Sequence, residues 1–317
     1  MRKQFYGFRK EIEKRFDNLN TEGRIRQIPN SWKNINYSRL DRVDKIEIGV
    51  LTTLFLESFA KKHGKIKNLT ELLFDFGIDP RWEFILATAK NIQIDRVDYI
   101  GNFFGAITEA IKVRHLESAG KYNFLGSKNC SVDYINYALR DFAEFSEDFK
   151  FNTINKLEEY GFAFSKNAEG EHLQEANEQF GVGSSGLRVN HIHRLGKLGL
   201  HNSVSARIGK LDRADYDFAI FSKDLIVEDA GMLDDCGFTK SLNGRIGKLS
   251  YSDGGLGFFS KGINIGEWHR GTYFELWGSE DATVKKLLFE KMPEWKLNTQ
   301  GFTIGDKNDT TNKSKKQ

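Results

Sequence analysis

The chain has 317 residues, 39% of them hydrophobic and 13% aromatic, which is enough to bury a sizeable core in one large domain or two. Its 47 lysine and arginine residues nearly balance 44 aspartate and glutamate residues, so a net charge of +3 excludes a global basic field, and any contact with a polyanion must be local. The only two cysteines, Cys130 and Cys236, exclude a disulfide framework and lack the C-x-x-C spacing of a zinc or redox motif.

The cysteine usage indicates a reducing cytoplasm, and the N-terminal segment and the apolar runs disfavour secretion and a membrane partner. Charged residues occupy the first positions, where a signal peptide carries its apolar stretch. The longest apolar run, Gly49 to Phe59, is interrupted by polar residues and is shorter than the roughly 20 residues of a membrane span.

Residues 1–150 carry the signals of consecutive helices. Ile46, Val50 and Leu54 share one helical face, and Asn68 followed by Glu71 has the spacing of a capping box. Further helices are predicted from Asp79-Pro80 to about Asn91, over 95–120 where Tyr99, Phe103, Ile107 and Ile111 recur every fourth residue, and from Ser131. We therefore expect a helical domain over residues 1–150.

The second part of the chain is richer in glycine, with 21 of the 30 glycines after residue 150. Short aromatic and β-branched runs such as DFAIFSK and TYFELWG alternate there with turn residues, which is typical of strands. The expected fold class is α+β, with a helical N-terminal domain, a glycine-rich and mostly antiparallel β domain over residues 151–303, and a disordered tail over residues 304–317.

An internal duplication lies within the second part. Residues 205–223 and 243–261 share RIGKL, an aspartate (Asp215 and Asp253) and a closing Phe-Ser-Lys at an offset of 38 residues. Phe164-Ser165-Lys166 resembles a third copy at a different spacing. Two clear copies indicate reuse of a strand-and-turn unit, and self-association is one use of such repeats.

A glycine-serine turn, Gly183 to Gly186, precedes the motif Asp215-Tyr216-Asp217. Two carboxylates one residue apart on a strand share a face, so Asp215 and Asp217 could hold Mg²⁺ or Mn²⁺ while Gly183 and Ser184 present backbone N–H groups to phosphate. Asp215 can equally be an ordinary turn residue, because aspartate often flanks strands.

This arrangement resembles that of nucleotidyltransferases, over the stretch from Gly183 to Asp217, although the gap from Ser184 to Asp215 is longer than in that family. The resemblance implies metal-dependent phosphoryl transfer with a third carboxylate, for which Glu275 is the first candidate and Asp229 the second. A nuclease that adds Lys223 to the same carboxylates is an alternative.

Residues 188–210 form a basic run with three histidines, five lysines or arginines and no acidic residue. His191 and His193 could bind a transition metal together with His201 or His269, but the basic neighbours favour an anion. The candidate contacts to a nucleotide or nucleic acid are Arg188, His191, His193, Arg194, Lys197 and Arg207.

Two function classes follow from these patterns. One is a nucleotide- or nucleic-acid-associated enzyme that catalyses metal-dependent phosphoryl transfer. The other is a non-catalytic assembly or binding protein built on β repeats. No motif decides between them, so enzymatic activity is left open.

Overall fold

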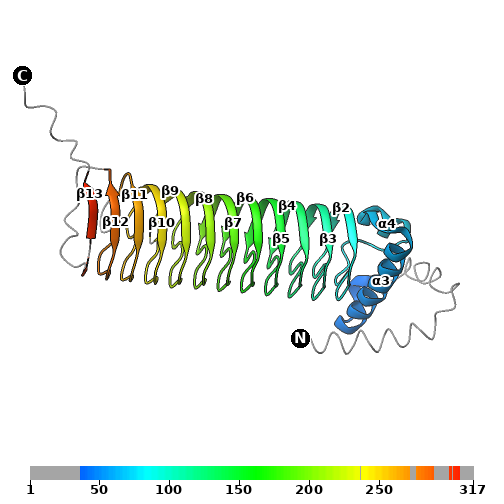
Figure 1. Cartoon of the computed structure of the whole chain (residues 1–317). Coiled ribbons are helices and arrows are strands. Elements are labelled where there is room, and N and C mark those ends of the chain that lie inside the picture. Colours follow the sequence, from blue (N-terminus) through cyan, green and yellow to red (C-terminus); the bar gives the residue numbers. More distant parts are fainter. Residues whose placement is uncertain (1–35, 236, 272–275, 289–299, 302, 308–317) are drawn as a thin grey trace, which may run out of the picture. The chain divides into compact units, whose positions relative to one another are not determined.

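A computed structural model describes residues 36–235, 237–271, 276–288, 300–301 and 303–307. The chain forms two compact units, Met1–Gly170 and Glu171–Gln317. Each unit is dominated by parallel β-strands that follow one another in chain order, as Figure 1 shows. Each unit is therefore a parallel β-solenoid, in which the chain winds and every turn adds one strand to a sheet.

The first unit begins with helices and continues as a stack of strands. In chain order the elements are the 3₁₀ helix η1 (Tyr37–Arg39), α3 (Arg42–His63), β1 (Ile66–Asn68), α4 (Leu69–Asp75), β2 (Gln93–Ile100), β3 (Lys112–Ala119), β4 (Ser131–Arg140) and β5 (Lys150–Glu159). Gln93 pairs with Lys112, and Lys112 pairs with Ser131. The side chains of Asn136 and Asn155, which are 19 residues apart in the sequence, are hydrogen-bonded neighbours in successive strands, and this separation is the length of one turn.

The second unit repeats the same winding. β6 (Glu169–Glu178) spans the boundary, and β7 (Arg188–Lys197), β8 (Arg207–Ala214), β9 (Ile226–Leu233), β10 (Arg245–Ser252), β11 (Asn264–Trp268), β12 (Thr283–Leu287) and β13 (Thr303–Lys307) follow. From β7 to β13 each strand pairs in parallel with the next. None of the described helices is long and apolar enough to cross a membrane.

Two of the predicted helices are confirmed, and their ends follow the expected local chemistry. The Asp41 side chain accepts the N–H of Asp44 at the start of α3, and Gly64 ends it with a φ of 82°. Asn68 caps α4 by accepting the N–H groups of Thr70 and Glu71.

The prediction of a helical N-terminal domain is wrong beyond residue 75, because the predicted later helices are turns and strands. Residues 81–91 lie in turns and a short bridge, with Phe84 and Leu86 in the left-handed region. Residues 95–120 belong mostly to β2, to β3 and to the segment that joins them. We call such a segment, which joins one strand to the next, an arc. Ser131 is the first residue of β4. In these strands every third residue is buried, as in Ile94, Val97 and Ile100, and this spacing imitates the 3.6-residue period of a helix.

The prediction of a mostly antiparallel sheet is also wrong. Turn residues between short apolar runs indicate where strands end but do not fix their direction. Here the arc between the end of β2 and the start of β3 returns the chain to its starting side, so that successive strands run in the same direction. The predicted α+β class is therefore wrong, and each unit is a parallel β-solenoid.

The internal duplication corresponds to two turns of the solenoid and reflects an alternation in the core. In the arcs of the first unit a large residue precedes a small one in Phe104-Gly105 and Phe142-Ala143, and the order is reversed in Gly161-Phe162. The rings meet edge to face, with centroids 5.6 Å apart for Phe124 and Phe142 and 5.8 Å apart for Phe142 and Phe162. Equivalent packing thus recurs only every second turn.

The second unit has the same alternation in Phe218-Ala219, Gly237-Phe238 and Leu256-Gly257. Both predicted copies, 205–223 and 243–261, contain the large-then-small order, which is why they match each other better than the turn between them. Phe164 and Phe221 occupy the same position of their turns, three turns apart, so Phe164-Ser165-Lys166 is in register with the repeat.

Small hydroxyl residues, which we call the hydroxyl column, occupy the same position in ten successive turns from Thr108 onward. The column consists of Thr108, Ser127, Ser146, Ser165, Ser184, Ser203, Ser222, Ser241, Ser260 and Ser279, all buried. Most of their hydroxyls donate to backbone carbonyls of the arc, as Ser184 does to Gly181 at 2.6 Å and Ser241 does to Ala219 at 2.5 Å. The column therefore satisfies carbonyl groups that the arc buries.

Candidate ligand groove and the predicted site residues

The residues Asp215 and Asp217 lie in the arc after β8, not on a strand. The carboxylate of Asp215 accepts hydrogen bonds from Arg194 at 2.8 Å and from Arg213 at 2.9 Å. Asp217 has a left-handed φ of 62°, and its N–H donates to the Asp235 carbonyl at 3.0 Å. Asp215 therefore pairs with arginines, and the two carboxylates do not share a strand face.

Of the other predicted catalytic residues, Lys223 lies near the end of this arc and Asp229 lies on the next strand. The side chain of Lys223 is exposed, and its backbone forms isolated parallel β-bridges with Val204 and with Leu242. Asp229 lies on β9 in register with Lys210. Glu275 lies outside the described residues.

Within the described ranges, no group of three or more His, Cys, Asp or Glu residues is arranged to hold a metal ion. The prediction of a metal-dependent phosphoryl-transfer enzyme, whether nucleotidyltransferase-like or a nuclease, is therefore wrong. The Asp-x-Asp pattern suggested a metal because strand geometry would have placed both carboxylates together, and the arc does not. The predicted Mg²⁺ or Mn²⁺ has no such ligand group in this part of the chain.

The glycine-serine turn contributes its polar groups to the solenoid itself. The Gly183 N–H donates to the His201 carbonyl at 2.8 Å, and the Ser184 N–H donates to Gly181 at 3.1 Å. Ser184 is buried within the hydroxyl column. These N–H groups are thus engaged within the fold.

The basic run 188–210 extends over β7 and the start of β8. His191 and His193 both contact one oxygen of Asp212, at 3.0 and 2.9 Å, and Lys210 contacts the other at 2.7 Å. Burial raises the pKa of Asp212, but the hydrogen bonds from Lys210, His193 and His191 outweigh it and bring that pKa well below its ordinary value.

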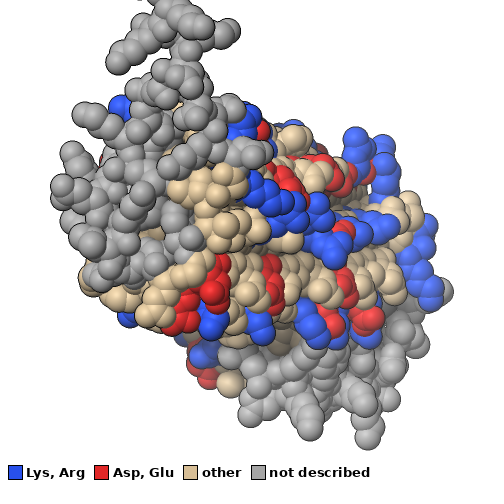
Figure 2. All heavy atoms as spheres, turned by 60° about the vertical axis from the view of Figure 1, so that its left-hand side comes forward, with Lys and Arg blue, Asp and Glu red and all other residues tan. Residues whose placement is uncertain are grey.

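The arginines of this run are paired as well. Arg194 contacts Glu175 at 3.2 Å in addition to Asp215, and Arg207 contacts Glu228 at 2.8 Å, while Lys197 and Arg188 are exposed. Figure 2 shows basic and acidic side chains next to one another over much of the visible face. Binding of a nucleotide or nucleic acid here, and self-association, stay predictions.

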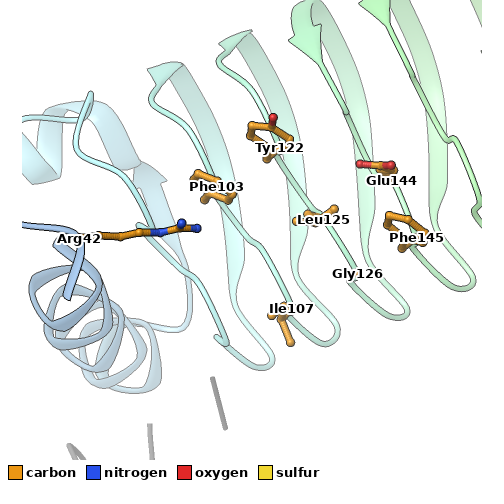
Figure 3. A pocket seen from close by; sticks show the side chains of 8 residues that line it. All are labelled: Arg42, Phe103, Ile107, Tyr122, Leu125, Gly126, Glu144 and Phe145. Carbon is orange, nitrogen blue, oxygen red and sulfur yellow. The ribbon is translucent and has the colours of Figure 1, made fainter. Parts of the chain in front are cut away.

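A groove in the first unit combines apolar walls with two charged groups (Figure 3). Its volume is about 620 Å³, within the range of small-molecule sites. The lining residues are Arg42, Phe103, Ile107, Tyr122, Leu125, Gly126, Glu144 and Phe145. Arg42 comes from the first turn of α3, and the others come from three successive arcs of the solenoid.

Stacked aromatic rings form the walls of this groove. The rings of Phe84, Phe103 and Tyr122 stack in series, with centroids 4.7 and 4.8 Å apart. On the other side Phe145 stacks on Phe164 at 5.2 Å and is 57% exposed. Because one turn separates the stacked residues, the solenoid itself fixes the spacing of these rings.

The hollow between the walls results from a missing side chain at one position of the turn. This position, which we call the gap column, is occupied by Ile107, Gly126, Phe145 and Phe164 in successive turns. A Cβ on Gly126 would meet a single atom within 4 Å, Ile107 Cγ1 at 3.9 Å. Gly126 has a φ of 62°, but Phe145 has a φ of 54° and carries a full side chain. The backbone therefore does not require glycine here.

Glu144 is the acidic residue of the groove. The neighbouring turns have Leu125 and Ala163 at the same position, so its carboxyl lies among apolar side chains. Burial raises the pKa of Glu144 to about 7, and the negative charge of Asp141 adds to the rise. Within the described chain no hydrogen bond or positive charge lowers this pKa. Such an unpaired, partly buried carboxyl is a common property of binding sites.

The sequence reasoning missed this groove because it found the doubled repeat and not the single turn. Aligning the turns on the hydroxyl column would have placed Gly126 between Ile107 and Phe145, and Glu144 between Leu125 and Ala163. A glycine between two bulky residues and an acid between two apolar residues are both visible in that alignment.

Comparison with known proteins gives no relative that would assign a role to these residues. No family model, no curated protein and no solved structure matches the chain.

Proposed function

We propose that this chain is a ligand-binding protein, and that the groove at Gly126 binds a small, largely apolar molecule. The observation that carries the proposal is the gap between Ile107 and Phe145, where the turn geometry accepts a side chain and the sequence has none. Apolar walls around such a gap favour an apolar ligand, because filling it removes apolar surface of both partners from water.

The dimensions of the groove favour a small molecule over a protein partner. About 620 Å³ accommodates a ligand of one or two rings. Stacked rings in the walls are held rigidly by the turns, so little side-chain entropy is lost when a ligand binds.

The test is titration of the neutral fluorescent probe N-phenyl-1-naphthylamine into the parent protein and into Gly126→Phe. Since Phe145 occupies the same column at the same sign of φ, the new ring should fit the fold and fill the groove. We expect about one equivalent of probe to bind the parent and the affinity of Gly126→Phe to be lower by about tenfold or more.

The matched control is Asn202→Phe, which adds the same ring at the same position of a turn in the second unit, where φ is 53°. Its affinity for the probe should equal that of the parent. The proposal is wrong if the parent does not bind the probe, or if Gly126→Phe and Asn202→Phe bind it as the parent does.

A further inference from the structure

The carboxyl of Glu144 identifies the chemical class of the ligand, on the assumption that the groove is a ligand site. We infer that the ligand carries an amine on an apolar body, and that the ammonium group pairs with Glu144 while the body occupies the gap at Gly126. This assigns the polar anchor of the site and its preference for cations.

The first argument is the lack of a cationic partner. Glu144 has no ion pair among the described residues, whereas neighbouring acids do: Glu147 pairs with Lys128, and Glu159 pairs with Arg140. A carboxylate placed in apolar surroundings without a counter-ion loses hydration that a bound ammonium group would replace.

The second argument is the aromatic lining. Tyr122 and Phe145 contribute to the same groove as Glu144, as Figure 3 shows. The negative faces of aromatic rings attract cations, most strongly where water is excluded. Rings and carboxylate therefore favour the same charge.

The third argument concerns the opposite charge at the groove. Arg42 is exposed at the beginning of α3, so its guanidinium keeps most of its hydration and adds little to the binding of an anion. Glu144 is partly buried and is therefore the stronger electrostatic determinant.

The groups that face Glu144 set the pH dependence. Asp141 lies on its own arc, Tyr122 is on the preceding arc, Arg42 is on α3, and the following arc has the apolar Ala163 at the corresponding position. Of these, Asp141 opposes ionisation of Glu144. An ammonium ligand binds the ionised form, so its affinity should rise with pH through neutrality.

The experiment compares three probes with one apolar body, 4-phenylbutylamine, 4-phenylbutanol and 4-phenylbutyrate, by calorimetric titration of the full chain at pH 6 and pH 8. At pH 8 we expect the amine to bind about tenfold more tightly than the alcohol, and the butyrate to bind most weakly. The preference for the amine should shrink at pH 6, and the affinity of the alcohol should not change.

Glu144→Gln tests the assigned residue, because it keeps the shape and removes the charge. It should bind amine and alcohol equally, while the control Glu147→Gln should retain the preference of the parent. Equal affinity of the parent for amine and alcohol, or tighter binding of butyrate that is lost in Arg42→Met, would overturn the assignment.

Gly126→Phe separates this inference from the proposed function. If Gly126→Phe lowers the affinity for both the amine and the alcohol, and the parent binds these two probes with equal affinity, the groove is a ligand site and the amine assignment is wrong. If Gly126→Phe binds both probes as tightly as the parent does, the groove is not a ligand site and the proposed function is wrong.

Discussion

The alternation of large and small residues in the arcs predicts a specific response to replacement of Phe142. This ring is fully buried, and its centroid lies 5.6 Å from that of Phe124, 5.7 Å from Phe149 and 5.8 Å from Phe162. Phe→Ala in a core typically costs about 3–5 kcal/mol, and three edge-to-face contacts place Phe142→Ala near the middle of that range, at about 4 kcal/mol.

The assay is urea unfolding followed by circular dichroism, with Phe145→Ala as the matched control. Phe145 is three residues along the same arc and 57% exposed, so its replacement should change the free energy of unfolding by less than about 1 kcal/mol. A difference between the two variants of at least about 2 kcal/mol is therefore expected.

The double variant Phe142→Ala with Ala143→Phe tests the alternation itself. It restores the total volume, but it would place Phe124, a new ring at 143 and Phe162 at the same position of three successive turns. Because overpacking is also destabilising, we expect no recovery of stability. The reasoning is refuted if Phe142→Ala is as stable as Phe145→Ala, or if the double variant recovers the stability of the parent.

The remaining predictions concern the free energy of unfolding of variants at five other residues. Ser241→Ala should lower the free energy of unfolding by about 1 kcal/mol, whereas Ser146→Ala, whose buried hydroxyl has no hydrogen-bond partner among the described residues, should leave it unchanged in the same urea assay. The free energy of unfolding of Glu144→Gln should equal that of the parent below pH 4.5 and exceed it by about 1–2 kcal/mol above pH 7. The reason is that the raised pKa of this partly exposed acid lowers the stability of the parent as the pH rises from 4.5 to about 7. Equal stability of the two proteins at pH 8 would contradict this. Asp212→Asn should be less stable at pH 7, with a deficit that shrinks as the pH falls below the ordinary value of 3.8, and a deficit independent of pH would refute the ion-pair account. Gly247→Ala should melt at a lower temperature by thermal denaturation, because its Cβ would lie 2.3 Å from the Glu228 carbonyl oxygen, and an unchanged melting temperature would show that the strands can separate freely there.

The sequence by itself determined the local features of this protein. The Asn68 side chain caps α4 and the backbone of Gly64 ends α3. Both signals lie within a few residues of a helix end, so α3 and α4 could be located from spacing alone. The duplication over two turns was also visible, because the order of large and small residues in Phe218-Ala219 returns in Leu256-Gly257.

Only the tertiary structure decided the direction of the strands and the location of the groove. Burial of every third residue, as in Ile94 and Val97, is compatible with a helix until pairing with the next turn shows that these residues belong to strands. The groove depends on residues one turn apart, which are neighbours only because the chain winds. Gly126 is a gap because Phe145 and Ile107 lie beside it, and Glu144 is a candidate anchor because burial raises its pKa.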